Sequence, residues 1–284
     1  MAENPAFQGH RLRDRLRKAR EAAGLTQREV AERLDWSPSK IIRIESGKIR
    51  VTVTDTMALV SHYGIEPSQA QEYTELARAA RQLPWYAPYR SVTTPELQAY
   101  LAYESSASII RNFEANLIPG LLQIEGYTRS ILGALAEENE NVRKNLDLLL
   151  QLRMERQERT LQPHDREFFF VIDEGALRRV VGSAEVMRQQ YERLLEANSL
   201  PNVTVLAVPF EAGPYPHFRA PYVVFEFPED EDDIVAYVEN PDGEVLLSEK
   251  SPGSDRKQPA DYLDIFWKVE KGVAKEVTSD FLFR

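Results

Sequence analysis

The sequence predicts two domains: an all-α, five-helix domain at the N-terminus and a larger α+β domain with a mainly antiparallel sheet. Three observations support this prediction. Residues 11–83 contain short amphipathic helical segments separated by capping residues and glycines. From residue 166 onward, runs of β-branched and aromatic residues are typical of strands. At 284 residues, the chain is also longer than one typical domain.

The charge of the chain is unevenly distributed. The formal net charge is −10, but residues 1–90 carry 15 Lys and Arg against 11 Asp and Glu, a net of +4. Residues 91–284 carry 20 against 34, a net of −14. Charges of opposite sign predict different partners for the two parts, because nucleic acid attracts the basic part and repels the acidic one.

Composition excludes several classes of protein. Cysteine is absent, which excludes a disulfide scaffold, thiolate metal sites and a cysteine nucleophile. The chain has no run of 18 apolar residues, and residues 1–16 lack the apolar stretch that secretion needs. We therefore expect a cytoplasmic protein that does not associate with membranes.

Two helices are predicted at the start of the N-terminal domain. The first covers residues 12–24 and ends at Gly24. Its apolar stripe consists of Leu12, Leu16, Ala19 and Ala23, and Arg13, Arg17, Lys18 and Arg20 lie largely outside it. Thr26 and Glu29 then form a capping box, so a second helix starts at Thr26 and ends near Asp35.

A third helix follows after a very short turn. Ser37 suits the N-cap and Pro38 the first helical position, so this helix spans about Pro38 to Ser46, and Gly47 ends it. Two capped helices joined by so short a turn cannot lie antiparallel. They must cross steeply, which is the helix-turn-helix arrangement.

Two more helices and a strap are predicted next. The fourth helix starts near Thr54 or Asp55, with Met57, Ala58, Val60 and Tyr63 as its apolar positions, and the fifth covers residues 67–83. Residues 83–90 hold two prolines and three aromatic residues, so this segment is expected to pack on a domain or on a second chain. The predicted domain boundaries are 1–83, 84–94 for the strap, and 95–284.

The outer face of the third helix is predicted to enter the major groove of DNA. Arg43 can form a bidentate pair with guanine O6 and N7, and Ile42 can contact a thymine methyl group. The N-termini of the second and third helices attract phosphate, where Gln27, Lys40 and Lys48 add contacts. The full predicted DNA-binding set is Gln27, Ser37, Pro38, Ser39, Lys40, Ile42, Arg43 and Lys48.

Residues 11–66 resemble the Cro/repressor (xenobiotic-response-element, XRE) family of helix-turn-helix regulators. The resemblance rests on Leu25, Thr26, Gln27, Ala31, Leu34, Ser37, Ile41, Arg43, Ile44, Glu45 and Gly47. It implies that Ser39, with Pro38 and Arg43, faces bases and that Gln27 holds a phosphate or an outer base. The sequence departs from the family pattern at Asp35, where the turn often has Gly, and at Pro38, whose side chain cannot donate a hydrogen bond. A helical bundle with a solvated basic face is the alternative, but it does not explain the repeated caps.

The C-terminal domain is expected to begin with helices and continue with strands. Residues 94–114 are predicted to be helical, Pro119 and Gly120 to break the chain, and residues 128–162 to form one or two long helices. The leucine-rich segment Leu146 to Leu152 either packs within its own domain or dimerises. The predicted strands are residues 167–173, 201–210, 220–227, 233–240 and 244–250.

Turns and helices complete the predicted sheet domain. Asn240 to Gly243 joins the last two strands as a hairpin, and helices from Gly175 to Ala197 and from Pro259 to Lys271 flank the strands. The acidic run PEDEDD, which ends at Asp233, either binds a cation, mimics phosphate or is a solvated loop.

The sequence does not predict an enzyme, a metal site or a cofactor. Polar candidates for catalysis are Asp173, Glu174, Arg178, Arg179 and His217, which form no known catalytic spacing. The four histidines lie far apart, and neither a GxSxG motif nor a glycine-rich phosphate loop occurs. Asp173 and Glu174 are instead expected to cap the following helix, and His217 to pack in a loop.

Residues 95–284 resemble the C-terminal domain of actinobacterial regulators that carry the same kind of helix-turn-helix in front. The resemblance rests on the stretches FEANLIPGLLQIEGYTRSIL, FFFVIDEGALRRVVG and PNVTVLAVPF, in that order. Those proteins are described as antitoxin-like transcriptional regulators, with a small protein encoded beside them as the presumed partner. The resemblance implies an architecture and a role, and no chemistry.

Two functions remain open. The first is a transcriptional regulator that binds double-stranded DNA as a homodimer on a palindromic operator, and whose acidic domain senses a partner protein or a small-molecule ligand. The second is an antitoxin-like interaction protein that neutralises a small companion protein and autoregulates its operon. The sequence does not separate them.

Overall fold

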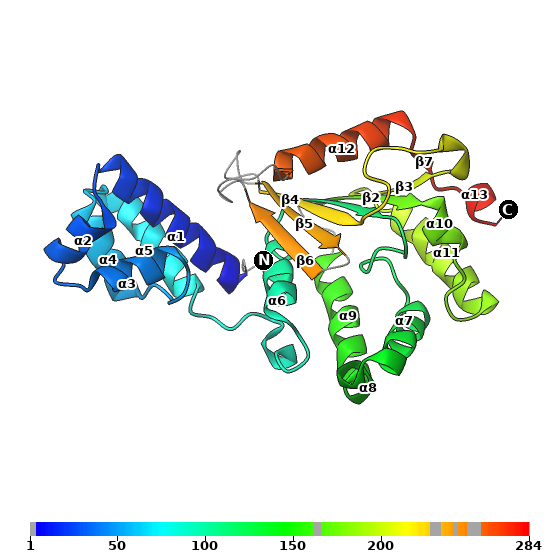
Figure 1. Ribbon diagram of the computed structural model, residues 1–284, viewed down its shortest axis with the longest axis horizontal. Helices are drawn as coiled ribbons and strands as arrows, with labels where there is room; N and C mark the ends of the chain where they lie inside the picture. Colours follow the sequence, from blue (N-terminus) through cyan, green and yellow to red (C-terminus); the bar gives the residue numbers. More distant parts are fainter. Residues whose placement is uncertain (1–3, 162–165, 228–233, 241–242, 249–256, 284) are drawn as a thin grey trace. The chain divides into compact units, whose positions relative to one another are not determined.

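The chain forms two compact units, Met1–Ala87 and Pro88–Arg284. A computed structural model describes residues 4–161, 166–227, 234–240, 243–248 and 257–283 (Figure 1). In the described residues the first unit is entirely helical, and the second contains a seven-stranded mixed sheet with helices. The fold class predicted from the sequence is therefore confirmed.

Five helices surround a single apolar core in the N-terminal unit. They are α1 (Pro5–Ala22), α2 (Gln27–Arg33), α3 (Pro38–Glu45), α4 (Val53–His62) and α5 (Pro67–Ala79). The buried core side chains include Leu12, Leu16, Val30, Ile41, Ile44, Leu59, Val60 and Leu76. The first helix starts well before the predicted residue 12, because the Asn4 side chain caps it and Pro5 occupies its first position.

The fourth helix starts near Thr54 and Asp55, as predicted. The N-cap is Thr52, whose side chain accepts a hydrogen bond from the backbone of Asp55, so Thr54 and Asp55 already lie in the first turn. Met57, predicted to face the core, is 60% exposed. The helix therefore buries the face that carries Thr56, Leu59 and Val60.

The predicted strap contains a short 3-10 helix, η1 (Ala87–Tyr89). Two tyrosines of residues 83–90, Tyr86 and Tyr89, are each 2% exposed, whereas Leu83 is 73% exposed. The Tyr89 hydroxyl donates to Glu155 within the C-terminal unit. The aromatic part of the strap is thus packed.

The sheet of the C-terminal unit has the order β6-β5-β4-β1-β2-β3-β7. Its strands are β1 (Ile109–Glu114), β2 (Glu167–Asp173), β3 (Val203–Val208), β4 (Tyr222–Glu226), β5 (Ile234–Asn240), β6 (Gly243–Ser248) and β7 (Lys275–Glu276). The pairs β1–β2 and β2–β3 are parallel, and the other neighbours are antiparallel. Asn240 pairs with Gly243, which confirms the predicted hairpin. The acidic run 228–233 lies outside the described residues.

The prediction of one helix over residues 94–114 was wrong. Only α6 (Pro95–Glu104) is helical, and the second half is the strand β1, between β2 and β4 near the middle of the sheet. Ile109 and Ile110 are β-branched, and both neighbouring strands come from distant parts of the chain. Pairing with the strands β2 and β4 therefore determines that this segment is a strand. The sequence of the segment alone does not reveal this pairing.

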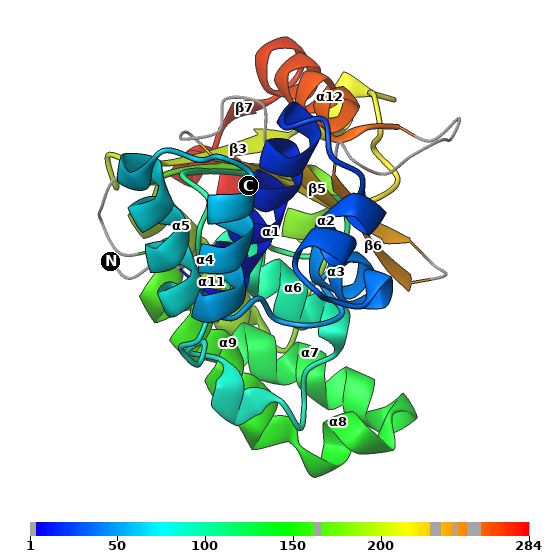
Figure 2. The same cartoon turned by 90° about the vertical axis from the view of Figure 1, so that its left-hand side faces the viewer.

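Helices lie on both faces of this sheet. The helices of this unit after α6 are α7 (Glu125–Glu138), α8 (Glu140–Lys144), α9 (Leu146–Thr160), α10 (Glu174–Arg178), α11 (Ala184–Asn198), α12 (Pro259–Gly272) and α13 (Ser279–Leu282). The helix α12 lies on one face and α6 and α9 lie on the other (Figure 1, Figure 2). Leu150 and Leu152 of α9 are buried, so the leucine-rich segment packs within its own unit. The predicted helix from Gly175 to Ala197 is divided into α10 and α11.

Candidate nucleic-acid interface

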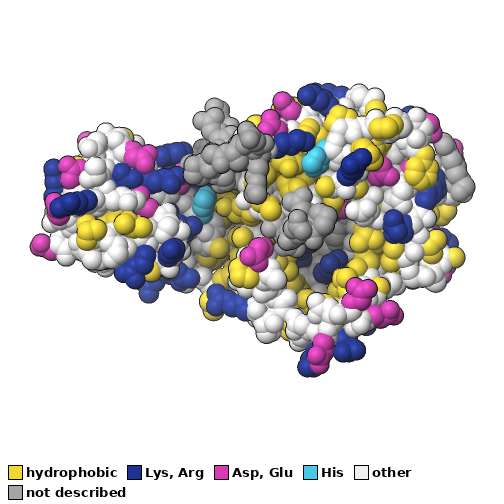
Figure 3. Space-filling view, in the orientation of Figure 1, with side chains coloured by type: hydrophobic (Ala, Val, Ile, Leu, Met, Phe, Trp, Pro, Cys, Tyr) yellow, Lys and Arg dark blue, Asp and Glu magenta, His cyan; other side chains and the backbone are white. Residues whose placement is uncertain are grey.

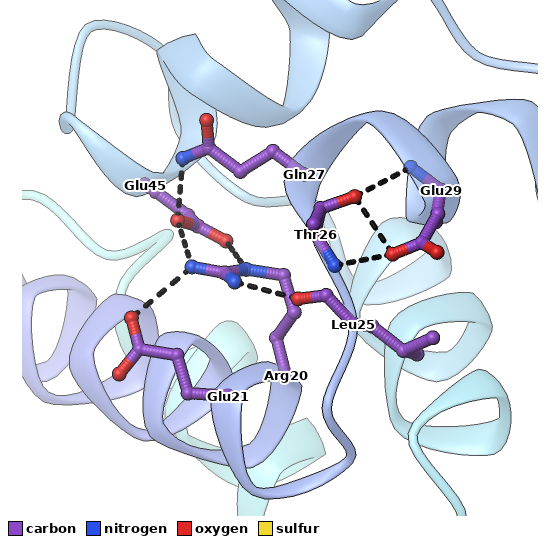
Figure 4. A network of polar contacts seen from close by, with 7 residues as sticks. All are labelled: Arg20, Glu21, Leu25, Thr26, Gln27, Glu29 and Glu45. Carbon is purple, nitrogen blue, oxygen red and sulfur yellow. Dashed lines mark hydrogen bonds and ion pairs between the residues drawn. The ribbon is translucent and has the colours of Figure 1, made fainter.

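A capping box and a tight turn set the positions of α2 and α3. The Thr26 hydroxyl accepts from the backbone N–H of Glu29 at 3.2 Å, and the Glu29 carboxylate accepts from the backbone N–H of Thr26 at 2.8 Å (Figure 4). This capping box was predicted and is confirmed. After α2, Asp35 adopts a φ of 53°, and the Trp36 N–H returns to the Ala31 carbonyl at 2.8 Å. The chain thus reverses and starts α3 within a few residues.

A buried ion pair joins α1 to α3. Arg20 Nε donates to Glu45 Oε1 at 2.7 Å and Arg20 Nη2 to Glu45 Oε2 at 3.0 Å (Figure 4). Arg20 Nη1 also donates to the Leu25 carbonyl at 2.8 Å, which adds the segment before α2. The two side chains are 10% and 7% exposed, and the hydrogen bond to Glu45 raises the pKa of Arg20. Such a two-pronged, charge-assisted hydrogen-bond pair fixes the position of α3 relative to α1.

The sequence prediction for Arg20 was wrong, since this residue was placed largely outside the apolar stripe. Leu12, Leu16 and Arg20 are spaced by four residues, so all three lie on the same buried side of α1. The predicted stripe residue Ala23 is exposed instead. The spacing of four residues could have indicated that Arg20 is buried. A charged side chain is buried only with a partner of opposite charge, however, and the partner Glu45 is distant in the sequence.

Gln27 lies at the first position of α2 and is part of the same network. Its Nε2 donates to Glu45 Oε2 at 2.7 Å (Figure 4). The structure therefore fixes the amide of Gln27 beside the start of α2. Contact between this side chain and a phosphate or base stays a prediction.

The outer face of α3 is exposed, as expected from its spacing. Ile41 and Ile44 are each 1% exposed, whereas Ile42 is 49% exposed. Ser37, Pro38, Ser39 and Arg43 are exposed as well. Ser37 occupies the N-cap position but makes no capping hydrogen bond with its side chain, which instead lies 3.2 Å from the Ser39 hydroxyl. Arg43 Nε donates to the Ser39 carbonyl at 3.2 Å.

The two predicted lysines differ in their surroundings. Lys40 Nζ lies 2.6 Å from Asp55 Oδ1 and 3.5 Å from the centre of the Trp36 ring. Burial opposes ionisation of Asp55, but the hydrogen bonds from Lys40 and Thr52 outweigh it and lower the pKa of Asp55. Lys40 thus joins α3 to the start of α4. Lys48 follows α3 and is exposed.

Cations gather on the visible face of the helical unit, around the place of α3 (Figure 3). The exposed cations on and just after this helix are Arg43, Lys48 and Arg50. The inner face of α3 packs in the core, and its outer face is polar except for Ile42. This arrangement can approach an anionic groove.

The residues considered for catalysis have structural partners. Asp173 Oδ1 accepts from the Gly175 N–H at 2.7 Å, which confirms the predicted cap of α10, and Asp173 Oδ2 accepts from the Tyr215 hydroxyl. Glu174 pairs with Arg178, which also donates to two backbone carbonyls near the C-terminus. Arg179 donates to a backbone carbonyl as well. His217 lies in the loop between β3 and β4 with a φ of 60°.

The geometry of α2 and α3 defines a helix-turn-helix protein, and this class indicates a DNA-binding regulator. Residues 11–72 match the family described as a helix-turn-helix domain. Residues 97–264, more than half of the chain, match the family described as Domain of unknown function (DUF5753), and the chain belongs to that family. No curated protein matches the chain.

The described residues contain neither a membrane-spanning helix nor a cluster of metal-ligating side chains. Among them, every helix is too short or too polar to span a bilayer. In the same part of the chain, no group of three or more histidine or acidic side chains is arranged to hold a metal ion.

Proposed function

We propose that the chain is a sequence-specific transcriptional regulator whose helix α3 reads bases in the major groove. The observation that best supports this is the contrast within α3. Ile41 and Ile44 are buried, whereas Ile42 is 49% exposed on a face shared with Ser39 and Arg43. An exposed isoleucine between polar and cationic side chains suits a surface that contacts both a thymine methyl group and a guanine edge.

Each predicted DNA-binding residue has a proposed role. Arg43 forms the bidentate contact to guanine, Ile42 contacts a thymine methyl group, and Ser39, with Pro38, lies against neighbouring base edges. The residues proposed to contact phosphate or the edge of the site are Gln27, Ser37, Lys40 and Lys48. The hydrogen bond of Gln27 and the ion pair of Lys40 with Asp55 position these two side chains before DNA arrives.

Binding affinities of variants test this proposal. Arg43→Ala is expected to lose about 1 to 3 kcal/mol of binding free energy on the specific site and to relax the preference at one base position. Lys48→Ala should weaken binding to all sequences similarly, because a phosphate contact carries no sequence information. The exposed Arg143 of α8 gives the control Arg143→Ala, which should bind as the wild type does. Unaltered specific binding by Arg43→Ala would contradict the proposal.

We further propose that the chain binds a palindromic operator as a homodimer and that the acidic C-terminal unit carries regulation. Residues 91–284 have a net charge of −14, so this unit is a poor second surface for DNA. Its proposed partner is a small companion protein or a small-molecule ligand. A partner that binds the free and DNA-bound forms unequally must change operator affinity by the same factor. Operator affinity that ignores saturating partner would contradict this role.

A further inference from the structure

Two carboxylates lie on one face of the sheet with a single strand between them. Glu114 ends β1, and Phe113 of β1 pairs with Tyr222 of β4. One residue further along, the same registers place Pro221 opposite Glu114 on one side and opposite Glu239 on the other. The Glu239 N–H of β5 donates to the Pro221 carbonyl at 3.3 Å, in agreement with this alignment. Residues directly opposite in a sheet share a face. Two strand spacings, about 10 Å, therefore separate the two backbone positions.

This face of the sheet is the one covered by α6 and α9. Glu239 lies two residues after Tyr237, whose ring centre is 4.7 Å from that of Tyr100 in α6. Arg156 of α9 donates to the Tyr100 hydroxyl at 2.9 Å. Figure 1 shows α9 on the side of the sheet opposite α12. The two glutamates therefore point to the side on which α9 lies.

Arg153 and Arg156 lie one turn apart on α9 and have different partners. Arg156 forms a two-pronged ion pair with Glu104, with distances of 2.8 and 2.6 Å. Arg153 makes one hydrogen bond to the described part of the chain, from Nη1 to Gln123 Oε1 at 3.1 Å. Glu114 likewise accepts one bond there, from Asn112 Nδ2 at 3.5 Å. Both charged groups thus retain hydrogen-bonding capacity that the described residues do not use.

The surroundings disfavour the charged forms of Glu114 and Arg153. Burial, with repulsion from Glu239 next, raises the pKa of Glu114 to about 8. Burial lowers the pKa of Arg153, although Glu114 and Glu239 partly oppose this effect. Ionisable groups with perturbed pKa values gather at binding sites more often than elsewhere in a protein.

The loop beside Arg153 is rigidly held by glutamines. Gln123 Nε2 donates to the Ile118 carbonyl at 2.7 Å, and its Oε1 also accepts from Thr128. Gln157 Nε2 donates to the carbonyls of Gly120 and Gln123 at 2.7 and 2.8 Å. This loop belongs to the stretch FEANLIPGLLQIEGYTRSIL, which the DNA-binding role does not explain. The hydrogen bonds fix the side chain that orients Arg153.

We propose that Arg153, Glu114 and Glu239 form a binding site for a small zwitterion of the amino-acid type. The carboxylate of the ligand accepts hydrogen bonds from the Arg153 guanidinium, and its ammonium group donates to the two glutamates. A plain anion would meet two carboxylates, and a plain amine would meet the guanidinium. The inference rests on the proposed function, because it names the class of signal that the C-terminal unit receives.

Ligand binding to the full chain tests the proposal. The probes are the twenty free amino acids, each assayed by thermal shift and the hits by calorimetry. For the best amino acid, the matched amine without the carboxylate and the matched acid without the ammonium should each bind at least about 10-fold more weakly, since each loses a charge-assisted bond. No binding by any amino acid, or equal binding of the matched amine or acid, would overturn the proposal.

Variants assign the site. Arg153→Gln, Glu114→Gln and Glu239→Gln should each weaken binding at least about 10-fold. The exposed Arg143 and Glu138 give the matched controls Arg143→Gln and Glu138→Gln, which should bind as the wild type does. Circular dichroism shows whether each variant folds, and wild-type affinity in a folded Arg153→Gln chain would overturn the site. Operator binding is measured separately, so a chain that binds an amino acid but no DNA contradicts the proposed function alone.

Discussion

Arg20 connects the three helices that present the DNA-binding surface. Its partner Glu45 is 7% exposed, so Arg20→Ala leaves a buried carboxylate without its cation. We expect this change to lower the free energy of unfolding of the N-terminal unit by about 3 to 5 kcal/mol. Urea unfolding followed by circular dichroism measures this loss.

The pair of Arg28 and Glu32 on α2 gives the control. Both side chains are more than half exposed, so Arg28→Ala should lower the free energy of unfolding far less than Arg20→Ala does, because solvent screens this pair. A loss for Arg20→Ala no larger than the loss for Arg28→Ala would show that the buried pair does not hold the helices.

Asp35 occupies a backbone conformation that glycine adopts more easily. Its φ of 53° lies in the left-handed region of backbone conformation, which is disfavoured for residues with a Cβ atom but which Asp tolerates better than most. We expect Asp35→Gly to raise the free energy of unfolding by up to about 1 kcal/mol and Asp35→Ala to lower it. Thermal unfolding of both variants tests this, and a destabilised Asp35→Gly chain would contradict the account of the turn.

Among single residues, the sequence predicted those whose role depends on neighbours in the chain. The capping box of Thr26 and Glu29 depends on a separation of three residues and was confirmed. The burial of Arg20 depends on Glu45, which is 25 residues away, and was missed. A charged side chain looks exposed until its distant partner is known.

At the scale of elements, β1 ends with a carboxylate whose ionisation opposes folding. The pKa of Glu114 is raised to about 8, above its ordinary value, so the stability contributed by the protonated form is full at low pH and is lost as the pH rises toward and through 8. Each unit of raised pKa corresponds to about 1.4 kcal/mol.

Urea unfolding at pH 5.5, 7 and 8.5 tests the effect of Glu114. Because a glutamine stays neutral, Glu114→Gln should gain stability relative to the wild type as the pH rises. The exposed control Glu138→Gln should keep the pH dependence of the wild type. Parallel pH profiles for Glu114→Gln and the wild type would mean that the carboxylate titrates normally.

The elements themselves were predicted to different degrees. Helices with caps and glycine ends were found, and so were the strands β2 to β6, because their β-branched runs differ from a helical period. The two-residue strand β7 was not predicted. The strand β1 was missed because its partners β2 and β4 lie far away in the sequence. The electrostatic interaction of Glu114 with Arg153 was not predicted either, since it arises only when the sheet and α9 come together.

At the scale of the whole molecule, one small helix-turn-helix domain reads only a few base pairs. Two copies related by a two-fold axis would read half-sites about 34 Å apart, so we expect a dimer on the operator. The strap, with Leu83 73% exposed, is the candidate surface, whereas the leucine-rich part of α9 is buried in its own unit. Sedimentation velocity at micromolar concentration measures this, and a monomer that protects a single half-site would contradict it.

The charge distribution indicates which part of the chain meets DNA. Residues 1–90 carry a net charge of +4 and residues 91–284 a net of −14, so electrostatic attraction to the duplex must come from the N-terminal unit. Affinity should therefore fall with rising salt. It should also fall when exposed cations near α3, such as Lys48, are replaced.

Selection of duplexes from a random library by the full chain tests sequence-specific binding most directly. We expect enrichment of one motif with two inverted half-sites whose centres lie about 10 base pairs apart, one helical turn. Arg43→Ala, lacking the exposed guanidinium of α3, should enrich the same motif with one base position relaxed. No enriched motif after selection, or the identical motif from Arg43→Ala, would contradict the claim that α3 reads DNA sequence.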